Sequence, residues 1–164
     1  MMFKTTLDRF CWWLEQTDAS QAIQSTAWVV PAVQTVHILA IATVLGAVLM
    51  LNLRLLGLAG VDQPLARQSQ RYLPVIWWTL PVLLITGIVM IVGEPARSLK
   101  NPVFQLKMAL LLAALAVTAF YQLRLARDRL NAFPNGRGTA LLITLPSLAL
   151  WAAIVFAGRW IAYY

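Results

Sequence analysis

Hydrophobic residues run almost unbroken through four stretches of the chain, roughly 28–53, 73–92, 103–121 and 139–157. Each is close to the ~20 residues that an α-helix needs to cross a hydrocarbon core about 30 Å thick. None of them alternates apolar and polar positions as membrane β-strands do. Because lipid offers no partner for an open backbone group, the pattern predicts an all-α fold, an integral membrane four-helix bundle.

Ahead of these stretches, residues 3–16 predict a short amphipathic helix. Its apolar side chains recur on one face at helical spacing: Phe3, Leu7, Phe10, Cys11 and Leu14. Trp12 and Trp13 flank this stripe, as is typical of helices in the headgroup layer. Fourteen residues are too few to cross a membrane, so we expect an N-terminal interfacial helix.

Composition agrees with lipid as the solvent. Of 164 residues, 60% are hydrophobic and 12% are charged, about half the charged share of a soluble domain. The net charge of +7 would suit nucleic acid in a soluble protein, but here the charges lie at the ends of apolar stretches. We therefore expect the lipid bilayer as partner and no nucleic acid. The length suits a single transmembrane domain over residues 1–164.

The distribution of Lys and Arg predicts the orientation. The first and third connections carry seven of them: Arg54, Arg67, Arg71, Arg124, Arg127, Arg129 and Arg137. The other side carries five, or six with Lys107: Lys4, Arg9, Arg97, Lys100 and Arg159. Positive charges concentrate in the cytoplasm, so the count predicts both termini in the periplasm.

The four stretches contain a weak internal repeat. Residues 52–55 (Asn-Leu-Arg-Leu) resemble residues 122–125 (Gln-Leu-Arg-Leu), and residues 79–81 (Thr-Leu-Pro) recur at 144–146. Because both matches run in the same direction along the chain, they predict two pseudo-symmetric parallel hairpins, related by an axis along the membrane normal. Chance similarity between Leu-rich segments is the alternative. An offset of 70 residues would place His37 and Lys107 at equivalent positions.

His37 is the only histidine of the chain and lies about nine residues into the first stretch, roughly 12–14 Å along the helix. An ionisable group at this depth costs about 2.5–3.5 kcal/mol when charged and usually faces the bundle interior. Neutral imidazole is a ligand for haem iron, copper or zinc. Small neighbours (Val33, Ala40, Val44 and Ala47) leave space for a flat cofactor or for a close helix. A structural hydrogen bond is the alternative role.

Lys107 lies about five residues into the third stretch. Alone, its ammonium group would extend to the membrane surface. Paired with His37 by the repeat, it becomes a cofactor-binding residue that holds a carboxylate or propionate, or a proton carrier. The sequence shows no nucleophilic triad, phosphate loop or zinc cluster, so whether the protein is an enzyme stays open.

Several short motifs resemble those of an uncharacterised family of small bacterial four-helix inner-membrane proteins. These are Trp28-x-x-Pro31-x-Val33-x-x-x-His37-Ile-Leu, Leu53-Arg-Leu-Leu-Gly57, Thr86-Gly87 and Asn101-x-x-Phe104-x-x-Lys107. More distantly, the plan is similar to HemJ-type protoporphyrinogen oxidase, in which a His and a Lys are implicated and haem b is bound. It is also similar to copper-resistance protein D, thought to move copper across the inner membrane. Only His37 and Lys107 can be mapped onto either.

Together these features predict a membrane-embedded redox protein that binds haem b near the periplasmic face, with His37 as axial metal ligand and Lys107 assisting. One alternative is a non-enzymatic membrane subunit or assembly factor whose His and Lys hold helices together. Another is transport of copper or a small solute through the bundle. Small residues allow close packing within one chain, in a homo-oligomer or in a larger membrane complex.

Overall fold

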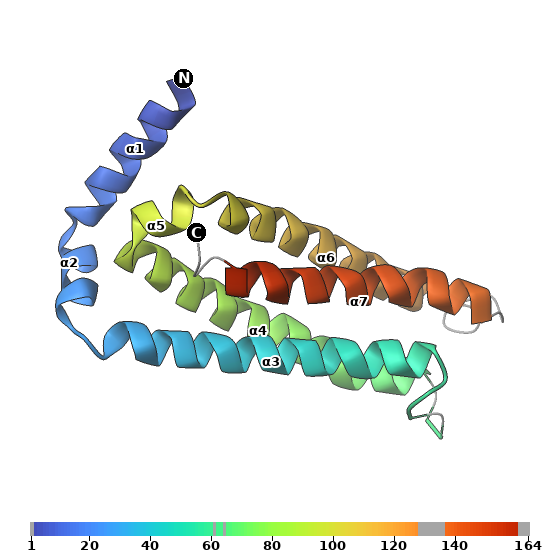
Figure 1. Cartoon of the computed structure of the whole chain (residues 1–164). Helices are drawn as coiled ribbons and strands as arrows, with labels where there is room; N and C mark the ends of the chain where they lie inside the picture. The colour runs from blue at the N-terminus through green and yellow to red at the C-terminus, as the bar shows by residue number, and fades with distance from the viewer. Residues whose placement is uncertain (1, 61, 64, 128–136, 161–164) are drawn as a thin grey trace.

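The computed structural model is built from helices (Figure 1), and no strand occurs among the residues that it describes, 2–60, 62–63, 65–127 and 137–160. Four long helices form its body: α3 (Val29–Leu55), α4 (Leu65–Gly93), α6 (Pro102–Arg127) and α7 (Arg137–Trp160). They contain the four predicted stretches almost entirely and extend beyond most of their ends. The predicted all-α class is therefore confirmed.

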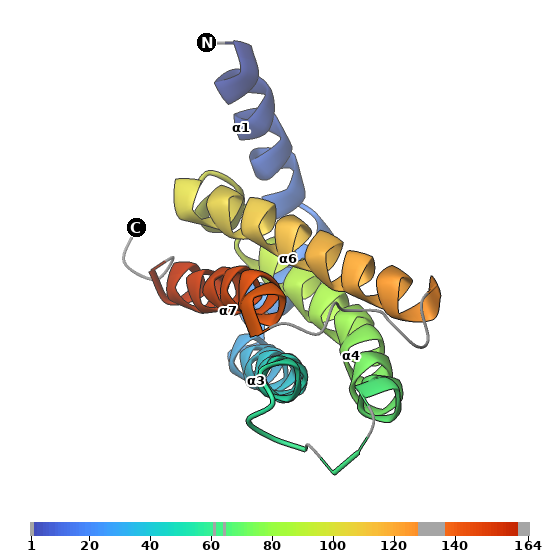
Figure 2. The ribbon, with the colours of Figure 1, turned by 90° about the vertical axis from the view of Figure 1, so that its right-hand side faces the viewer.

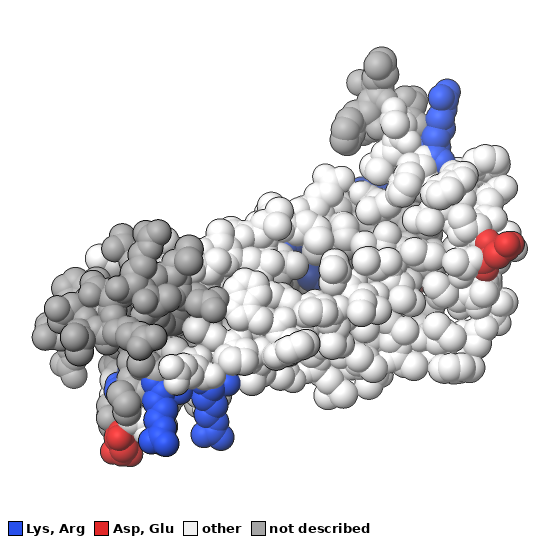
Figure 3. Space-filling view, turned by 180° about the vertical axis from the view of Figure 1, so that it is seen from behind, with Lys and Arg blue, Asp and Glu red and all other residues white. Residues whose placement is uncertain are grey.

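The surfaces of the long helices are suited to lipid. Helices α3, α4 and α6 are each long and apolar enough to cross a membrane. Exposed large apolar side chains occur on all four long helices, among them Ile38, Leu39, Trp78, Leu84, Leu112, Phe120, Leu142 and Phe156. In Figure 3, most charged side chains gather at the two ends of the molecule, with a broad uncharged band between them. These features indicate a helical membrane protein; that α7 is a fourth crossing remains a prediction.

The long helices are arranged as two hairpins. Helix α3 packs against α4, and α6 packs against α7, while α3 and α7 join the two pairs. Figure 1 shows that α3 and α6 run in the same direction and that α4 and α7 return, and Figure 2 shows α7 beside both α3 and α6. The hairpins are therefore parallel, as the repeat predicted, whereas their pseudo-symmetry remains a prediction.

A narrow apolar core lies along the axis of the bundle. It combines one face of each long helix, and its buried members are Val44, Ala47, Val48, Leu51, Leu73, Ile76, Ala114, Trp151 and Ile154. Two of these residues, Ala47 on α3 and Ala114 on α6, are small, as is typical of helix interfaces in lipid, where the hydrophobic driving force is absent. This core separates two polar regions, one near each end of the bundle.

Helix α2 (Asp18–Ser25) caps the C-terminal end of α4. The last carbonyl groups of a helix have no partner within it. Here the Ser20 hydroxyl donates to the Val92 carbonyl at 2.7 Å, and the Gln24 side-chain amide donates to the Gly93 carbonyl at 2.9 Å. This helix was not predicted from the sequence, because it lies outside the apolar stretches.

Helix α1 (Met2–Glu15) confirms the predicted N-terminal helix and lies against α5 (Pro95–Leu99), a second helix that the sequence did not predict. Only part of its apolar stripe faces the protein: Cys11 is buried, whereas Phe10, Trp12 and Trp13 are exposed. Figure 1 shows α1, α2 and α5 together at one end of the bundle, with α1 inclined to the long helices. The exposed aromatic rings suit a membrane surface, and the interfacial location of α1 remains a prediction.

Candidate functional site

A hydrogen bond between neighbouring helices fixes the His37 ring. Nδ1 of His37, on α3, lies 2.7 Å from Oγ1 of Thr86, on α4. The Thr86 hydroxyl has one proton, which it donates to the Val82 carbonyl one turn earlier, at 2.7 Å. With that proton engaged, the hydroxyl can only accept from His37, so Nδ1 carries the imidazole proton. The lone pair of Nε2 is then free to bind a ligand.

Gly87, the next residue on α4, faces the same ring. A Cβ atom at this position would lie 3.8 Å from Cε1 of His37, in ordinary van der Waals contact. Glycine therefore leaves only backbone against that edge of the imidazole. Thr86 thus orients the ring through a hydrogen bond, and Gly87 places no side chain against it.

Lys107 occupies a corresponding place in the second hairpin. Its side chain lies against Gly158 of α7, where a Cβ atom would be 3.6 Å from Nζ. Lys107 on the first helix of its hairpin thus faces a glycine on the second, as His37 does. The ammonium group is half-buried within a region of apolar helices, where a charge without a counter-charge is unfavourable.

His37 and Lys107 lie on the first helix of different hairpins, and each contacts the second helix of its own hairpin. Both side chains are half-buried and contact helices of the bundle rather than pointing to lipid. The sequence placed them at similar depth on facing halves, and their shared use of one ligand remains a prediction.

The small residues that follow His37 on α3 pack helices instead of leaving a void. Ala40, Val44 and Ala47 are all buried in the bundle. The sequence left open whether these small residues make space for a flat cofactor or for a close helix. In the part of α3 that follows His37, the structure shows a close helix.

Charged groups near the end of the bundle that carries α2 and α5 are paired with one another. Glu94 forms an exposed ion pair with Arg97 at 2.9 Å, as a solvated charge would. Asp8 of α1 holds Lys100, which directly follows α5, at 2.6 Å, and this hydrogen bond raises the pKa of Lys100. The ammonium group therefore stays charged at neutral pH, and a rise of the pH through that raised pKa removes its side of the ion pair. Burial raises the pKa of the Cys11 thiol beside this pair.

Sequence reasoning named His37 and Lys107 but missed the residues that position them. Thr86-Gly87 formed part of a family-like motif to which no role was assigned, and no contact of Gly158 with Lys107 was predicted. The usable signal was the hydroxyl residue followed by glycine inside an apolar helix, since buried imidazole needs a partner for its N–H. No group of three or more His, Cys, Asp and Glu side chains able to hold a metal ion occurs in the described part of the chain.

The arrangement defines a class: a small helical membrane protein with an oriented imidazole and a lysine inside its bundle. Residues 17–164 match the model of a family of unknown function, DUF6644, and the chain belongs to that family. The match includes the cap helix α2 and leaves α1 outside. No curated protein and no solved structure matches the sequence. The resemblance to an uncharacterised family is thereby confirmed, whereas the comparisons lend no support to the likeness with HemJ-type oxidase or copper-resistance protein D.

Proposed function

We propose that this protein binds haem b inside the membrane, with His37 as axial ligand, and serves a redox function there. The observation that carries the proposal is the hydrogen bond from Nδ1 of His37 to Thr86. Histidines that ligate metals almost always donate their other ring N–H to a partner, which fixes the tautomer and the ring orientation.

The number of donor groups favours haem over a bare metal ion. Zinc and copper sites usually take three or four protein ligands. This chain has one histidine and one cysteine, and Cys11 lies on α1. A porphyrin supplies four nitrogen ligands of its own, so a single imidazole is enough to hold its iron. Transport of copper is correspondingly less well supported by these residues.

Lys107 would serve as the cationic partner. Haem b carries two propionate groups, and an ammonium group within the bundle needs an anion or water beside it. No salt bridge of Lys107 occurs among the described residues. We therefore assign Lys107 to a propionate rather than to the iron.

An absorption spectrum of the protein purified in mild detergent tests the proposal. We expect a Soret band, lost in His37→Ala and retained in Thr35→Ala, an exposed change on the same helix. Lys107→Met should weaken binding several-fold, whereas Lys100→Met, a lysine outside the bundle, should not. A wild-type protein that stays colourless after haem is added would refute the proposal and favour the non-enzymatic subunit.

Thr86 offers a finer test of the same site. Thr86→Val keeps the shape of the side chain and removes the acceptor for Nδ1–H. Loss of such a partner typically costs about 10- to 100-fold in affinity for the bound group. Thr86→Ser should restore binding, because it restores the hydroxyl. Equal affinities in the Val and Ser variants would show that the hydrogen bond does not support a ligand.

The proposed setting is the bacterial inner membrane, with α7 as a fourth crossing and both termini in the periplasm. Support comes from the apolar outer surface of α7 and from the excess of arginine in the first and third connections. Part of that excess, in residues 128–136, lies outside the described residues. A C-terminal alkaline phosphatase fusion should be active; an inactive fusion with a fluorescent C-terminal reporter would reverse the orientation.

A further inference from the structure

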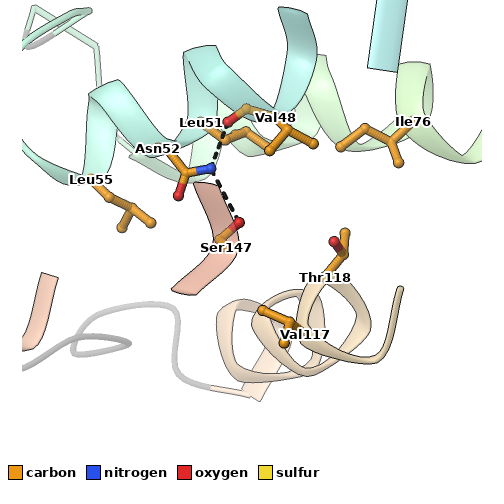
Figure 4. Close-up of a pocket in the computed structure, with 8 residues that line it drawn as sticks. All are labelled: Val48, Leu51, Asn52, Leu55, Ile76, Val117, Thr118 and Ser147. Carbon is orange, nitrogen blue, oxygen red and sulfur yellow. Dashed lines mark hydrogen bonds between the residues drawn. The ribbon is translucent and has the colours of Figure 1, made fainter. Parts of the chain in front are cut away.

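An apolar groove lies between the two hairpins, near the end of the bundle opposite α2 and α5. It is open to the surface of the bundle, and its floor is recessed, because Val48, Leu51 and Ile76 are buried. A hydrogen bond of 3.3 Å from the Asn52 amide to the Ser147 hydroxyl joins α3 to α7 beside it. Figure 4 shows the eight residues that line this groove: Val48, Leu51, Asn52, Leu55, Ile76, Val117, Thr118 and Ser147.

The groove follows from the way the two hairpins pack. Helices α3 and α7 join them, whereas α6 makes few direct contacts with α3 or α4. Ile76 on α4 and Val117 on α6 therefore line a space that helix packing leaves open. The polar hydrogens beside it are engaged, since both amide protons of Asn52 and the hydroxyl proton of Thr118 have acceptors. In a membrane this space faces hydrocarbon, so it suits an alkyl chain rather than water.

The groove ends at the depth of the arginines that flank the first connection. It extends to Leu55, the last residue of α3. Thr86 of α4 lies opposite His37 of α3. Because both helices rise equally per residue, the antiparallel pair brings Arg71 to about the depth of Asn52. A positive charge is therefore present where the groove reaches the end of the bundle.

Arg71 is exposed and forms no ion pair with any carboxylate that the structure describes. Its guanidinium group lies 5.9 Å from the centre of the Tyr72 ring, and Tyr72 packs against the apolar core. This contact holds the charge beside the bundle. A guanidinium group can bind two phosphate oxygens at once through parallel N–H donors. The end of the groove is thus complementary to a phosphate group.

We propose that the groove binds one anionic phospholipid, with an acyl chain along Val48, Leu51 and Ile76 and the phosphate beside Arg71. Such a lipid combines a long alkyl chain with a negative charge at one end, as the groove and the arginine require. It fills the space between α6 and the first hairpin, where direct contacts are few. The site is independent of haem binding, because it lies in the opposite half of the bundle from His37.

Native mass spectrometry of the protein in mild detergent tests the groove. After removal of copurified lipid, phosphatidylglycerol or phosphatidylcholine is added back, and we expect one phosphatidylglycerol to be retained per chain. Val117→Trp places a large ring in the groove and should abolish this retention. Leu112→Trp, at a position 69% exposed on the same helix, should leave it unchanged. Equal retention in the two variants would overturn the proposal, as would a retained molecule without phosphate or a second copy of the chain.

Arg71→Gln tests the head group and leaves the groove intact. It should lower the affinity for phosphatidylglycerol about five-fold, the contribution of one arginine at an anionic membrane surface. The affinity for phosphatidylcholine should not change. Arg97→Gln, an exposed arginine at the other end of the bundle, is the matched control and should alter neither affinity. Equal affinities of the wild-type protein for the two lipids would refute the assignment of an anionic lipid.

Discussion

Replacing Ser20 with alanine tests whether α2 holds the end of α4. The Ser20 hydroxyl is fully buried, donates to the Val92 carbonyl at 2.7 Å and accepts from the Gln24 amide at 3.0 Å. The change removes both bonds and leaves a helix-terminal carbonyl unpaired. One lost bond costs about 1 kcal/mol, and an unsatisfied buried group costs about 1–3 kcal/mol. We expect a loss of about 1–2 kcal/mol, because Gln24 can turn to the freed carbonyl.

Ser25 on the same helix is the control for this measurement. Its hydroxyl is exposed and bonds only to the Ala22 carbonyl of its own helix, at 3.1 Å. Ser25→Ala should therefore change stability by less than about 0.5 kcal/mol. Unfolding by sodium dodecyl sulfate in mixed micelles, followed by tryptophan fluorescence, compares the variants. Equal losses for Ser20→Ala and Ser25→Ala would show that the cap does not stabilise the bundle.

Two further predictions concern the same end of the molecule. A Cβ atom at Gly93 would lie 3.0 Å from the Ile23 side chain of α2, so Gly93→Ala should destabilise the fold. A Cβ atom at Gly46 would meet nothing within 4 Å, so Gly46→Ala should stabilise α3 by up to about 1 kcal/mol. Equal effects of the two variants on SDS unfolding would contradict this. Asp8→Asn breaks the ion pair between α1 and α5, so the buried Cys11 should react several-fold faster with maleimide. Glu94→Gln breaks an exposed pair within one segment and should leave that rate unchanged; a faster rate in both variants would show that α1 is not held by its contact with α5.

The long helices could be predicted from sequence because each depends on a local property. A run of apolar residues long enough to cross lipid must be helical, since its backbone has no other partner. The same reasoning found α1 from its one-sided stripe. It could not find α2, because Asp18–Ser25 is polar and gains its stability from the C-terminal carbonyls of α4, about 70 residues away. Nor could it find α5, which has five residues.

The candidate site was predictable to the extent that burial of a charged group is unusual. His37 and Lys107 stand out in apolar surroundings, and the repeat offset predicts that they occupy equivalent positions, whereas their use of one site stays a prediction. Thr86 could not be recognised as the partner of His37, because threonines inside helices often bond to their own backbone, as Thr35, Thr43 and Thr79 do here. Which threonine also meets a neighbouring helix depends on how α3 and α4 pack.

The bonds between α2 and the end of α4 also constrain how the chain is threaded through a bilayer. Helix α2 precedes α3, and the carbonyls that it binds close α4. A chain that crosses on α3 must therefore cross back on α4 before these groups can meet, so the number of crossings between them is even. The N-terminal segment and α5 then share one compartment, whichever it is. A single topology reporter on the N-terminus therefore also reports the compartment of α5. If the distribution of Lys and Arg between the two sides were reversed, α3 and α4 would invert their orientation together.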